Sequence, residues 1–401
     1  MSPRRQWLLA GLLAGAWAPG RAAARANDSD AGAGNAGNAE ADRIHPDRRL
    51  AFPRDHGAHP GARIEWWYAT GWLHGPGGAL FGFQLTFFRS RTGLGSGADR
   101  AAPGRFVPRQ LLFAHAAVTD VAARRHRHAQ RLLRWSGDEA LPEAHARRAD
   151  TAVALGRWSL ARQTASAGAG PALNPSYSAV LDAPDAGFTL GLRLQATQPL
   201  LLQGQAGHSR KGPQPAQASH YYTQPQLAVQ GQLTLQGRPL PGAAGASLPG
   251  RGWLDHEWSD ALLAPGATGW DWMGINLADG GALTAFVLRR ADGSVLWAGG
   301  SHRPAGGPVR NFAPGEVLFE PLREWRSPAT GARYPVAWRI STPAGRHQLQ
   351  ALLDDQELDS RASTGTVYWE GLSELLAPGG ARIGLGYLEM TGRLQALRLG
   401  A

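Results

Sequence analysis

The chain has 401 residues, of which 43% are hydrophobic and 18% charged, so it has enough apolar side chains to fill the cores of two or three domains. It contains no cysteine, which excludes disulfides, thiol catalysis and a lipidated cysteine anchor. The net charge is +10, but nearly all the basic residues are scattered arginines. The densest basic run, residues 124–134, is more typical of a solvated hairpin edge than of a phosphate-binding surface, so no nucleic-acid partner is predicted.

Residues 1–26 are typical of a signal peptide. They combine a basic start, an apolar run over residues 7–18 and an ARA cleavage triplet at residues 24–26. The RRQWL sequence at residues 4–8 is close to a twin-arginine signal, so both general secretory and twin-arginine export stay open. The apolar run is shorter than the roughly 20 residues of a membrane helix, so we expect a cleaved signal, a periplasmic or secreted protein and no transmembrane segment in the mature chain.

Residues 27–45 lack large apolar side chains and are predicted to form a disordered linker. From residue 51 onward, apolar and polar side chains alternate in short segments separated by glycine and proline. The clearest segments are residues 80–88, 188–195 and 227–235. Alternation with a period of two is typical of antiparallel strands with one buried face, so we predict an all-β fold.

Residues 236–252 are rich in glycine, alanine and proline and mark a predicted domain boundary. The expected domains are residues 46–245 and residues 250–396, and each is long enough to close an eight-stranded barrel. A weak sequence similarity between two segments of the chain supports a tandem arrangement of domains. IEWWYATGWL at residues 64–73 resembles TVYWEGLSEL at residues 366–375.

The segment WLDHEWSD, residues 253–260, concentrates groups that could carry chemistry. In a regular strand His256 and Trp258 share one face, and Asp255 lies on the other. In GWDWMGI, residues 269–275, Trp270 and Trp272 share a face, and Asp271 points the opposite way.

A cavity lined by tryptophans with one ionisable group suits two tasks. It can hold a long apolar ligand. It can also protonate a carbon–carbon double bond, because indole rings stabilise a cation and a buried carboxyl keeps its proton. On spacing alone, packing of these residues in a barrel core is the favoured alternative.

Two further segments carry candidate residues. In RIEWWYATGW, Glu65 shares a face with Trp67, and Tyr68 lies on the other face; Glu65 needs a cation, either Arg63 or another arginine, and is predicted to form a structural ion pair. In SHYYTQP, Tyr222 lines a pocket mouth or holds the strand in place.

No motif for a cofactor or a metal is found. There is no dinucleotide fingerprint, phosphate loop or nucleophile elbow, so no cofactor is expected. The pairs His56/His59 and His126/His128 have metal-like spacing, but no third ligand can be named for either, so no metal site is predicted.

Several segments resemble the AttH / hydroxyneurosporene-synthase family of tandem lipocalin-like proteins, labelled carotenoid 1,2-hydratase-like. The resemblance is carried by FPRDHGAHPGARIEWWYATGWL, SHYYTQPQLAVQGQL, GWLDHEWSD, GWDWMGINLADG, YWEGLSEL and GYLEMTG, and it covers nearly all of residues 50–395. It implies two lipocalin-like β-barrels in tandem, export, and a gene neighbourhood with an ABC transporter of the lipoprotein-release type. Some relatives hydrate the terminal double bond of acyclic carotenoids without a cofactor, and more distant fungal relatives cyclise polyenes.

In the hydratases, a His-x-Trp motif and a downstream Tyr-x-Asp pair are held to be functional. His256 and Trp258 match the first motif here. The strand expected to hold the second motif, ALTAFVLRR, has Phe286 and no carboxylate, and Asp271 is the nearest inward-facing candidate.

Three functions follow from these observations. The favoured one is an exported protein that binds a large hydrophobic ligand, such as a lipid or isoprenoid, and works with an ABC transporter permease. Its predicted ligand-binding residues are Trp67, Tyr68, Tyr222, Trp258, Trp270 and Trp272. The second is a cofactor-free hydro-lyase with Asp271 or Asp255 as acid and His256 as base or orienting group. The third is a structural module of an inner-membrane complex.

Overall fold

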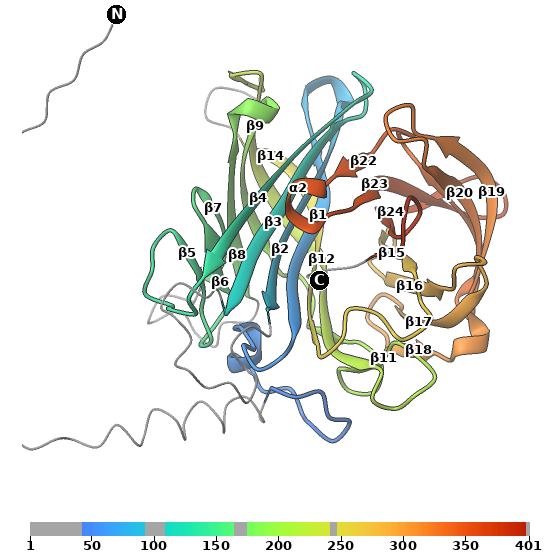
Figure 1. Cartoon of the computed structure of the whole chain (residues 1–401). Helices are drawn as coiled ribbons and strands as arrows, with labels where there is room; N and C mark the ends of the chain where they lie inside the picture. Colours follow the sequence, from blue (N-terminus) through green and yellow to red (C-terminus); the bar gives the residue numbers. More distant parts are fainter. Residues whose placement is uncertain (1–41, 93–108, 164–174, 241–246, 398–401) are drawn as a thin grey trace, which may run out of the picture.

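The computed structural model describes residues 42–92, 109–163, 175–240 and 247–397. The chain forms two antiparallel β-sheets that lie side by side, each curved around its own core (Figure 1). The predicted all-β class and the tandem barrels are therefore confirmed. The predicted signal peptide, residues 1–26, and the linker up to residue 41 lie outside the described residues. Within the described ranges, no helix combines the length and hydropathy needed to cross a membrane.

The first sheet contains β1 (Ile64–His74), β2 (Leu80–Arg91), β3 (Gln110–Asp120), β4 (Arg125–Trp135), β5 (Ala144–Ala146), β6 (Ala152–Leu155), β7 (Trp158–Gln163), β8 (Ser176–Ala183), β9 (Phe188–Gln195), β10 (Leu201–Leu202), β11 (His208–Arg210), β12 (Ala218–Leu235), β13 (Arg238–Pro239) and β14 (Leu248–Ser259). The second sheet contains β15 (Gly269–Leu277), β16 (Ala282–Arg289), β17 (Val295–Arg303), β18 (Arg310–Phe312), β19 (Leu318–Arg326), β20 (Arg333–Thr342), β21 (Gly345–Ala351), β22 (Glu357–Asp359), β23 (Val367–Leu376) and β24 (Arg382–Met390). The described helices are short: η1 (Arg54–His56), η2 (Pro76–Gly78), η3 (Pro184–Ala186), η4 (Pro314–Glu316) and α2 (Arg361–Thr364).

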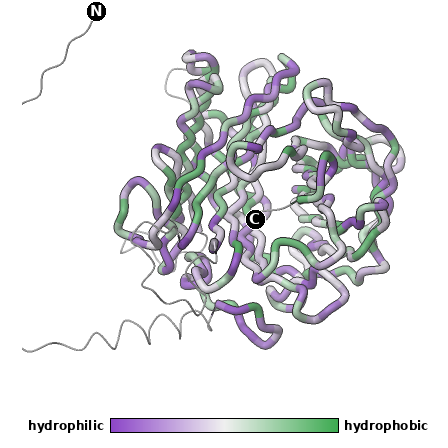
Figure 2. Tube along the Cα trace, viewed as in Figure 1, coloured by the Kyte–Doolittle hydropathy of each residue, from purple (hydrophilic) through white to green (hydrophobic). Residues whose placement is uncertain are grey.

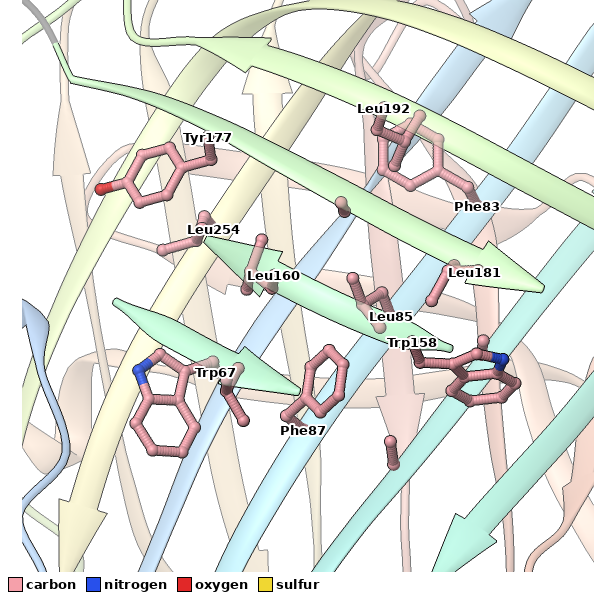
Figure 3. Packing of buried hydrophobic residues seen from close by; sticks show 14 of the residues in the cluster. Trp67, Phe83, Leu85, Phe87, Trp158, Leu160, Tyr177, Leu181, Leu192 and Leu254 are labelled. Carbon is pink, nitrogen blue, oxygen red and sulfur yellow. The ribbon is translucent and has the colours of Figure 1, made fainter. Parts of the chain in front are cut away.

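The first sheet runs in the order β4-β3-β2-β1-β14-β12-β9-β8-β7-β6-β5. Its ends approach each other, since β4 contacts both β5 and β6. Alternate side chains of these strands fill the interior, including Trp67, Phe83, Phe87, Trp158 and Leu192 (Figure 3). The predicted alternation of β2 is present, with its phenylalanines at positions 81, 83 and 87 inside this first barrel.

The second sheet runs in the order β18-β17-β16-β15-β24-β23-β21-β20-β19, and its two end strands are joined through the short η4 turn. Its own apolar cluster contains Met273, Val336, Trp338 and Trp369. A third cluster lies between the sheets and takes residues from both. Figure 2 shows apolar and hydrophilic positions interleaved along the strands, as expected for sheets that fill a barrel with every second side chain.

The division between the sheets differs from the predicted boundary. β14 pairs with β1 and β12 and belongs to the first sheet, although the second domain was predicted to begin at residue 250. The second sheet begins only at β15. Glycine, alanine and proline are as frequent in a loop within a sheet as in a linker between domains, and residues 236–252 lead from the end of β12 through the short β13 into β14.

Two regions expected at the surface contact the barrels. Asp42 lies in the predicted linker, and its Oδ2 accepts a hydrogen bond from Gly61 N at 2.9 Å. The basic run on β4 packs partly against the second sheet, since Gln130 Nε2 donates to Asp359 O at 2.8 Å and His128 Nε2 accepts from Asp359 N at 3.2 Å.

A hydrogen-bonded junction at Gln226 joins the sheets on the other side. A bulge in β12 places Gln226 at a φ of 55°. Its backbone N donates to Asn276 Oδ1 at 2.8 Å, and its side chain donates to Leu277 O at 2.9 Å and to Gly281 O at 2.7 Å. Asn276 Nδ2 in turn donates to Gly252 O at 2.9 Å. The Asn276 side chain therefore satisfies one backbone donor and one backbone acceptor of the first sheet.

We predict that Asn276→Ala lowers the free energy of unfolding. The change leaves two buried backbone groups without partners, each at a cost of about 1–3 kcal/mol. Chemical denaturation should show a loss of about 2 kcal/mol or more. The control is Asn311→Ala, because Asn311 is exposed and makes a single surface hydrogen bond to Gly204 O. Equal losses for the two variants would contradict the assigned role of Asn276.

Candidate functional site

A cavity of about 130 Å³ lies between the two sheets. We call it the inter-barrel cavity. Its walls are the outward faces of β1, β2, β3, β12 and β14 on one side and of β15, β16, β23 and β24 on the other. The aromatic residues among its lining include Trp66, Tyr68, Phe88, Trp270, Trp272 and Tyr368. The polar side chains that face it include His115, Lys211, Asp255, Glu257, Glu370 and Glu389.

Strand register brings the ionisable groups together. In the first sheet, Asp255 lies opposite Tyr68 on β1 and opposite Thr223 on β12. In the second sheet, Glu389 on β24 lies opposite Glu370 on β23 and opposite Trp272 on β15. Directly opposed residues project from the same face of a sheet, so each sheet presents a row of polar and aromatic groups to the cavity.

Asp255 is a buried carboxyl with two hydroxyl donors. Thr223 Oγ1 donates to Oδ1 at 2.6 Å and Tyr221 Oη donates to Oδ2 at 2.9 Å. Burial raises the pKa of Asp255 to about 7, although these hydrogen bonds act in the opposite direction. At neutral pH Asp255 can therefore either give or take a proton.

The second sheet supplies two more carboxyls, Glu389 and Glu370. Burial raises the pKa of Glu389 to about 7, and the nearby Asp255 and Glu257 charges add to this effect. Burial, followed by the Glu389 charge, raises the pKa of Glu370 well above its ordinary value. Two opposed carboxylates repel each other when both are ionised, so Glu370 is the member of the pair that keeps its proton.

Neutral hydrogen-bonding groups complete the cavity wall. Tyr368 Oη lies 2.8 Å from His115 Nδ1, and His115 Nε2 lies 2.8 Å from Ser363 Oγ. Burial lowers the pKa of His115 to about 3, so the ring is neutral.

At the rim of the cavity, Lys211 Nζ forms an ion pair with Glu257 at 2.9 Å and lies 4.4 Å from the centre of the Phe286 ring. This arrangement can transfer protons to or from an apolar molecule held between aromatic rings.

The predicted candidates separate into two groups on opposite faces of the strands. Tyr68, Asp255, Trp270 and Trp272 line the cavity. The remaining predicted ligand contacts, Trp67, Tyr222 and Trp258, lie inside the packed first barrel with His256. His256 Nδ1 lies 3.1 Å from Tyr222 Oη, and its Nε2 lies 2.9 Å from Glu65 Oε1.

Glu65 is the centre of this buried network. Its ion-pair partner is Arg89, whose Nε lies 2.8 Å from Oε2, and not Arg63. Burial alone would raise the pKa of Glu65, but Arg89 and then His59 hold it well below the ordinary value. The His59 ring stacks on Trp258 with centroids 3.6 Å apart.

His59, Glu65 and His256 offer three possible metal-ligand atoms within 4.8 Å of one another. Both histidines, however, hydrogen-bond directly to Glu65, at 2.8 Å and 2.9 Å, and Arg89 already binds the same carboxylate. A second cation would have to displace these bonds beside a guanidinium, so the geometry fits a hydrogen-bond network better than a metal centre.

Asp271 does not take the position expected of a proton donor. It points into the second barrel, where Arg289 Nε lies 2.8 Å and Arg393 Nη2 lies 2.7 Å from the carboxylate. Two guanidinium groups make this a structural ion pair, and the carboxylate does not line the cavity.

Sequence reasoning missed the carboxyls of the second sheet. Glu370 and Glu389 lie in YWEGLSEL and GYLEMTG, two segments that carried the family resemblance, but neither residue was considered as an acid. The similarity between residues 64–73 and residues 366–375 could have pointed to Glu370 as a cavity residue. It aligns Trp67 with Trp369 in the two barrel cores and aligns Tyr68 with Glu370 at the cavity.

Comparison with known proteins agrees with this architecture. The model of the AttH-like family matches residues 43–393. The crystal structure of a Nitrosomonas europaea protein assigned as an AttH has 43% sequence identity and a TM-score of 0.76, and the match covers 88% of this chain and 99% of that one. No curated protein sequence matches the chain.

Two more distant structures share the fold alone. Kievitone hydratase from Nectria haematococca is 12% identical, with a TM-score of 0.63 over 85% of this chain and 92% of that chain. CghA with Sch210972 is 14% identical, with a TM-score of 0.51 over 90% and 97%. Because the family model and the Nitrosomonas structure both span nearly the whole described chain, this protein belongs to the AttH-like family.

Proposed function

We propose that the protein binds an apolar, unsaturated molecule in the inter-barrel cavity and adds water to one of its carbon–carbon double bonds by acid catalysis. The observation that carries the proposal is a pair of cavity carboxyls, Asp255 and Glu389, whose pKa values burial raises to about 7. A general acid works best when its pKa lies near the ambient pH, because it then both donates and recovers the proton.

The reaction balances without a cofactor. The π electrons of the double bond take the proton of one carboxylic acid and form a C–H bond, which leaves a cation on the other carbon. A lone pair of water forms the C–O bond, and the surplus proton of that oxygen passes to a carboxylate. The indole side chains of Trp270 and Trp272 line the same space, where an indole ring can stabilise the cation through its quadrupole.

The fold shared with kievitone hydratase agrees with this reaction class. At 12% identity the likeness concerns the fold alone, so the proposal rests on the cavity and its carboxyls. The proposal also reverses the order favoured by the sequence, in which a carrier came first.

A carrier for a hydrophobic molecule is the second candidate, because the aromatic lining binds an apolar ligand whether or not it reacts. In that case the raised pKa values serve only to keep the cavity uncharged. Export to the periplasm or beyond, and an ABC transporter permease as partner, stay predictions from the sequence, as does a purely structural role in a membrane complex.

We predict that the purified mature protein incorporates labelled oxygen from H₂¹⁸O into acyclic isoprenoids, detected by mass spectrometry. Asp255→Asn and Glu389→Gln should each lower the rate by about 10²–10⁴-fold, since each removes one partner of the proton exchange. Asp292→Asn is the control, because this carboxyl is exposed on a turn away from the cavity. A protein that retains isoprenoid in native mass spectrometry and never labels it would be a carrier.

The raised carboxyl pKa values also predict a dependence of stability on pH. Between about pH 4 and pH 7 the native state holds protons that the unfolded chain releases, so the free energy of unfolding falls as the pH rises through this range. Asp255→Asn removes one such group. The difference in unfolding free energy between variant and wild type should therefore shift in favour of the variant by on the order of 2 kcal/mol from about pH 5 to about pH 8. A difference that stays constant with pH would contradict the burial assigned to Asp255.

A further inference from the structure

We propose that Tyr68 and Glu370 form the oxygen site of the inter-barrel cavity, and that the molecule bound there carries a neutral hydroxyl group. This inference rests on the proposed function, in which the oxygen belongs to the water that is added or to the alcohol that results. It assigns the polar end of the ligand to two residues, one from each sheet.

Two buried polar atoms point to this site. The Tyr68 side chain is 6% exposed and Glu370 is 1% exposed, and both line the cavity. Neither Tyr68 Oη nor Glu370 Oε1 has a hydrogen-bond partner of regular geometry among the described residues. Buried polar groups are nearly always paired in folded proteins, so two orphan groups facing one cavity indicate a partner that the protein itself does not supply.

The two groups are near neighbours. Both side chains line the same cavity, and after burial the Glu370 charge is the largest effect that raises the pKa of Tyr68. The phenol and the carboxyl lie close enough for a hydrogen bond between them to affect both pKa values, but the geometry is not that of a regular hydrogen bond, so neither atom is fully satisfied by the other. A small oxygen atom that bonds to both would complete the arrangement.

The second phenol near Glu370 cannot replace Tyr68 as donor. Ser363 Oγ donates to Gln130 Oε1 at 2.6 Å, so it accepts from His115 Nε2. The neutral His115 ring then has only Nδ1 as an acceptor, and this atom takes the Tyr368 hydroxyl proton at 2.8 Å. Tyr221, the third tyrosine of the cavity lining, donates to Asp255, so Tyr68 is the cavity tyrosine whose hydroxyl makes no regular hydrogen bond to a described residue.

The combination of one hydrogen-bond donor and one acceptor determines which chemical class of ligand the site can bind. Tyr68 offers an O–H, and the carbonyl oxygen of the protonated Glu370 carboxyl offers acceptor lone pairs. A hydroxyl oxygen accepts from the first and donates to the second, whereas a hydrocarbon does neither and an ether or ketone accepts only. An anion is disfavoured, because Glu370 and Glu389 are both acidic and no cation forms a salt bridge with either in the described parts of the chain.

The test compares two probes with the same carbon skeleton. Linalool is a ten-carbon tertiary alcohol, and 3,7-dimethyl-1,6-octadiene is the same molecule without its hydroxyl group. Each would compete with the fluorescent apolar probe N-phenyl-1-naphthylamine for the full mature protein. We expect roughly tenfold tighter binding of the alcohol, the usual contribution of one to two buried hydrogen bonds.

The variants locate that preference. Tyr68→Phe should abolish the preference for linalool while leaving the affinity for the hydrocarbon within about twofold. Glu370→Leu should do the same, and Glu370→Gln, which keeps an acceptor oxygen, should retain part of the preference. The control is Tyr177→Phe, because Tyr177 Oη is also buried without a partner, but it lies in the core of the first barrel.

The outcomes separate this inference from the proposed function. Equal binding of the two probes to the wild type, or a preference that survives in Tyr68→Phe, overturns the oxygen site while leaving an apolar cavity in place. Displacement of the reporter by neither probe overturns both.

Discussion

The structure depends on strands that are buried on both faces. β1 and β14 in the first sheet, and β23 and β24 in the second, direct alternate side chains into a barrel core and into the inter-barrel cavity. One residue step therefore changes a side chain from a packing role to a potential chemical role, as for Trp67 and Tyr68. This constraint explains why the His-x-Trp residues, His256 and Trp258, do not meet the cavity. They pack in the core of the first barrel, while their neighbours Asp255 and Glu257 face the inter-barrel cavity.

Electrostatics separates the carboxylates of the two environments. Inside the barrels each charge is neutralised, with Glu65 bound by Arg89 and Asp271 bound by two arginines. In the cavity, Asp255, Glu370 and Glu389 form no salt bridge with any described residue, and burial raises the pKa of each. A carboxyl that is removed from water without a counter-ion destabilises a fold, so three of them around one cavity are more readily explained by function than by packing.

Much of this architecture could be predicted from the sequence, because alternation is a local property. The all-β class, the tandem barrels and the opposite faces of Trp270 and Asp271 follow from a period of two. The residues that meet across the cavity could not be predicted, since Tyr68 and Glu370 are some 300 residues apart and nothing local encodes the contact between two sheets. The predicted domain boundary differs from the division between the two sheets for a related reason. The loop before β14 has the composition of a linker, and only strand pairing shows that β14 returns to the first sheet.

The sequence similarity between β1 and β23 is incomplete: Tyr68 on β1 takes the place that Glu370 has on β23. This difference makes the two sides of the cavity chemically unequal. Each strand is the neighbour of a strand carrying an acid: Tyr68 lies opposite Asp255, and Glu370 lies opposite Glu389. If both halves carried a glutamate at this position, four carboxyls without a salt-bridge partner would share the cavity with the Glu257–Lys211 ion pair, and their mutual repulsion would favour opening it. Tyr68 in the first half is a polar side chain that fills this position without adding the charge that a glutamate would add. The two halves thus provide one neutral donor, one neutral acid and two acids near neutrality, a set that neither barrel could assemble alone.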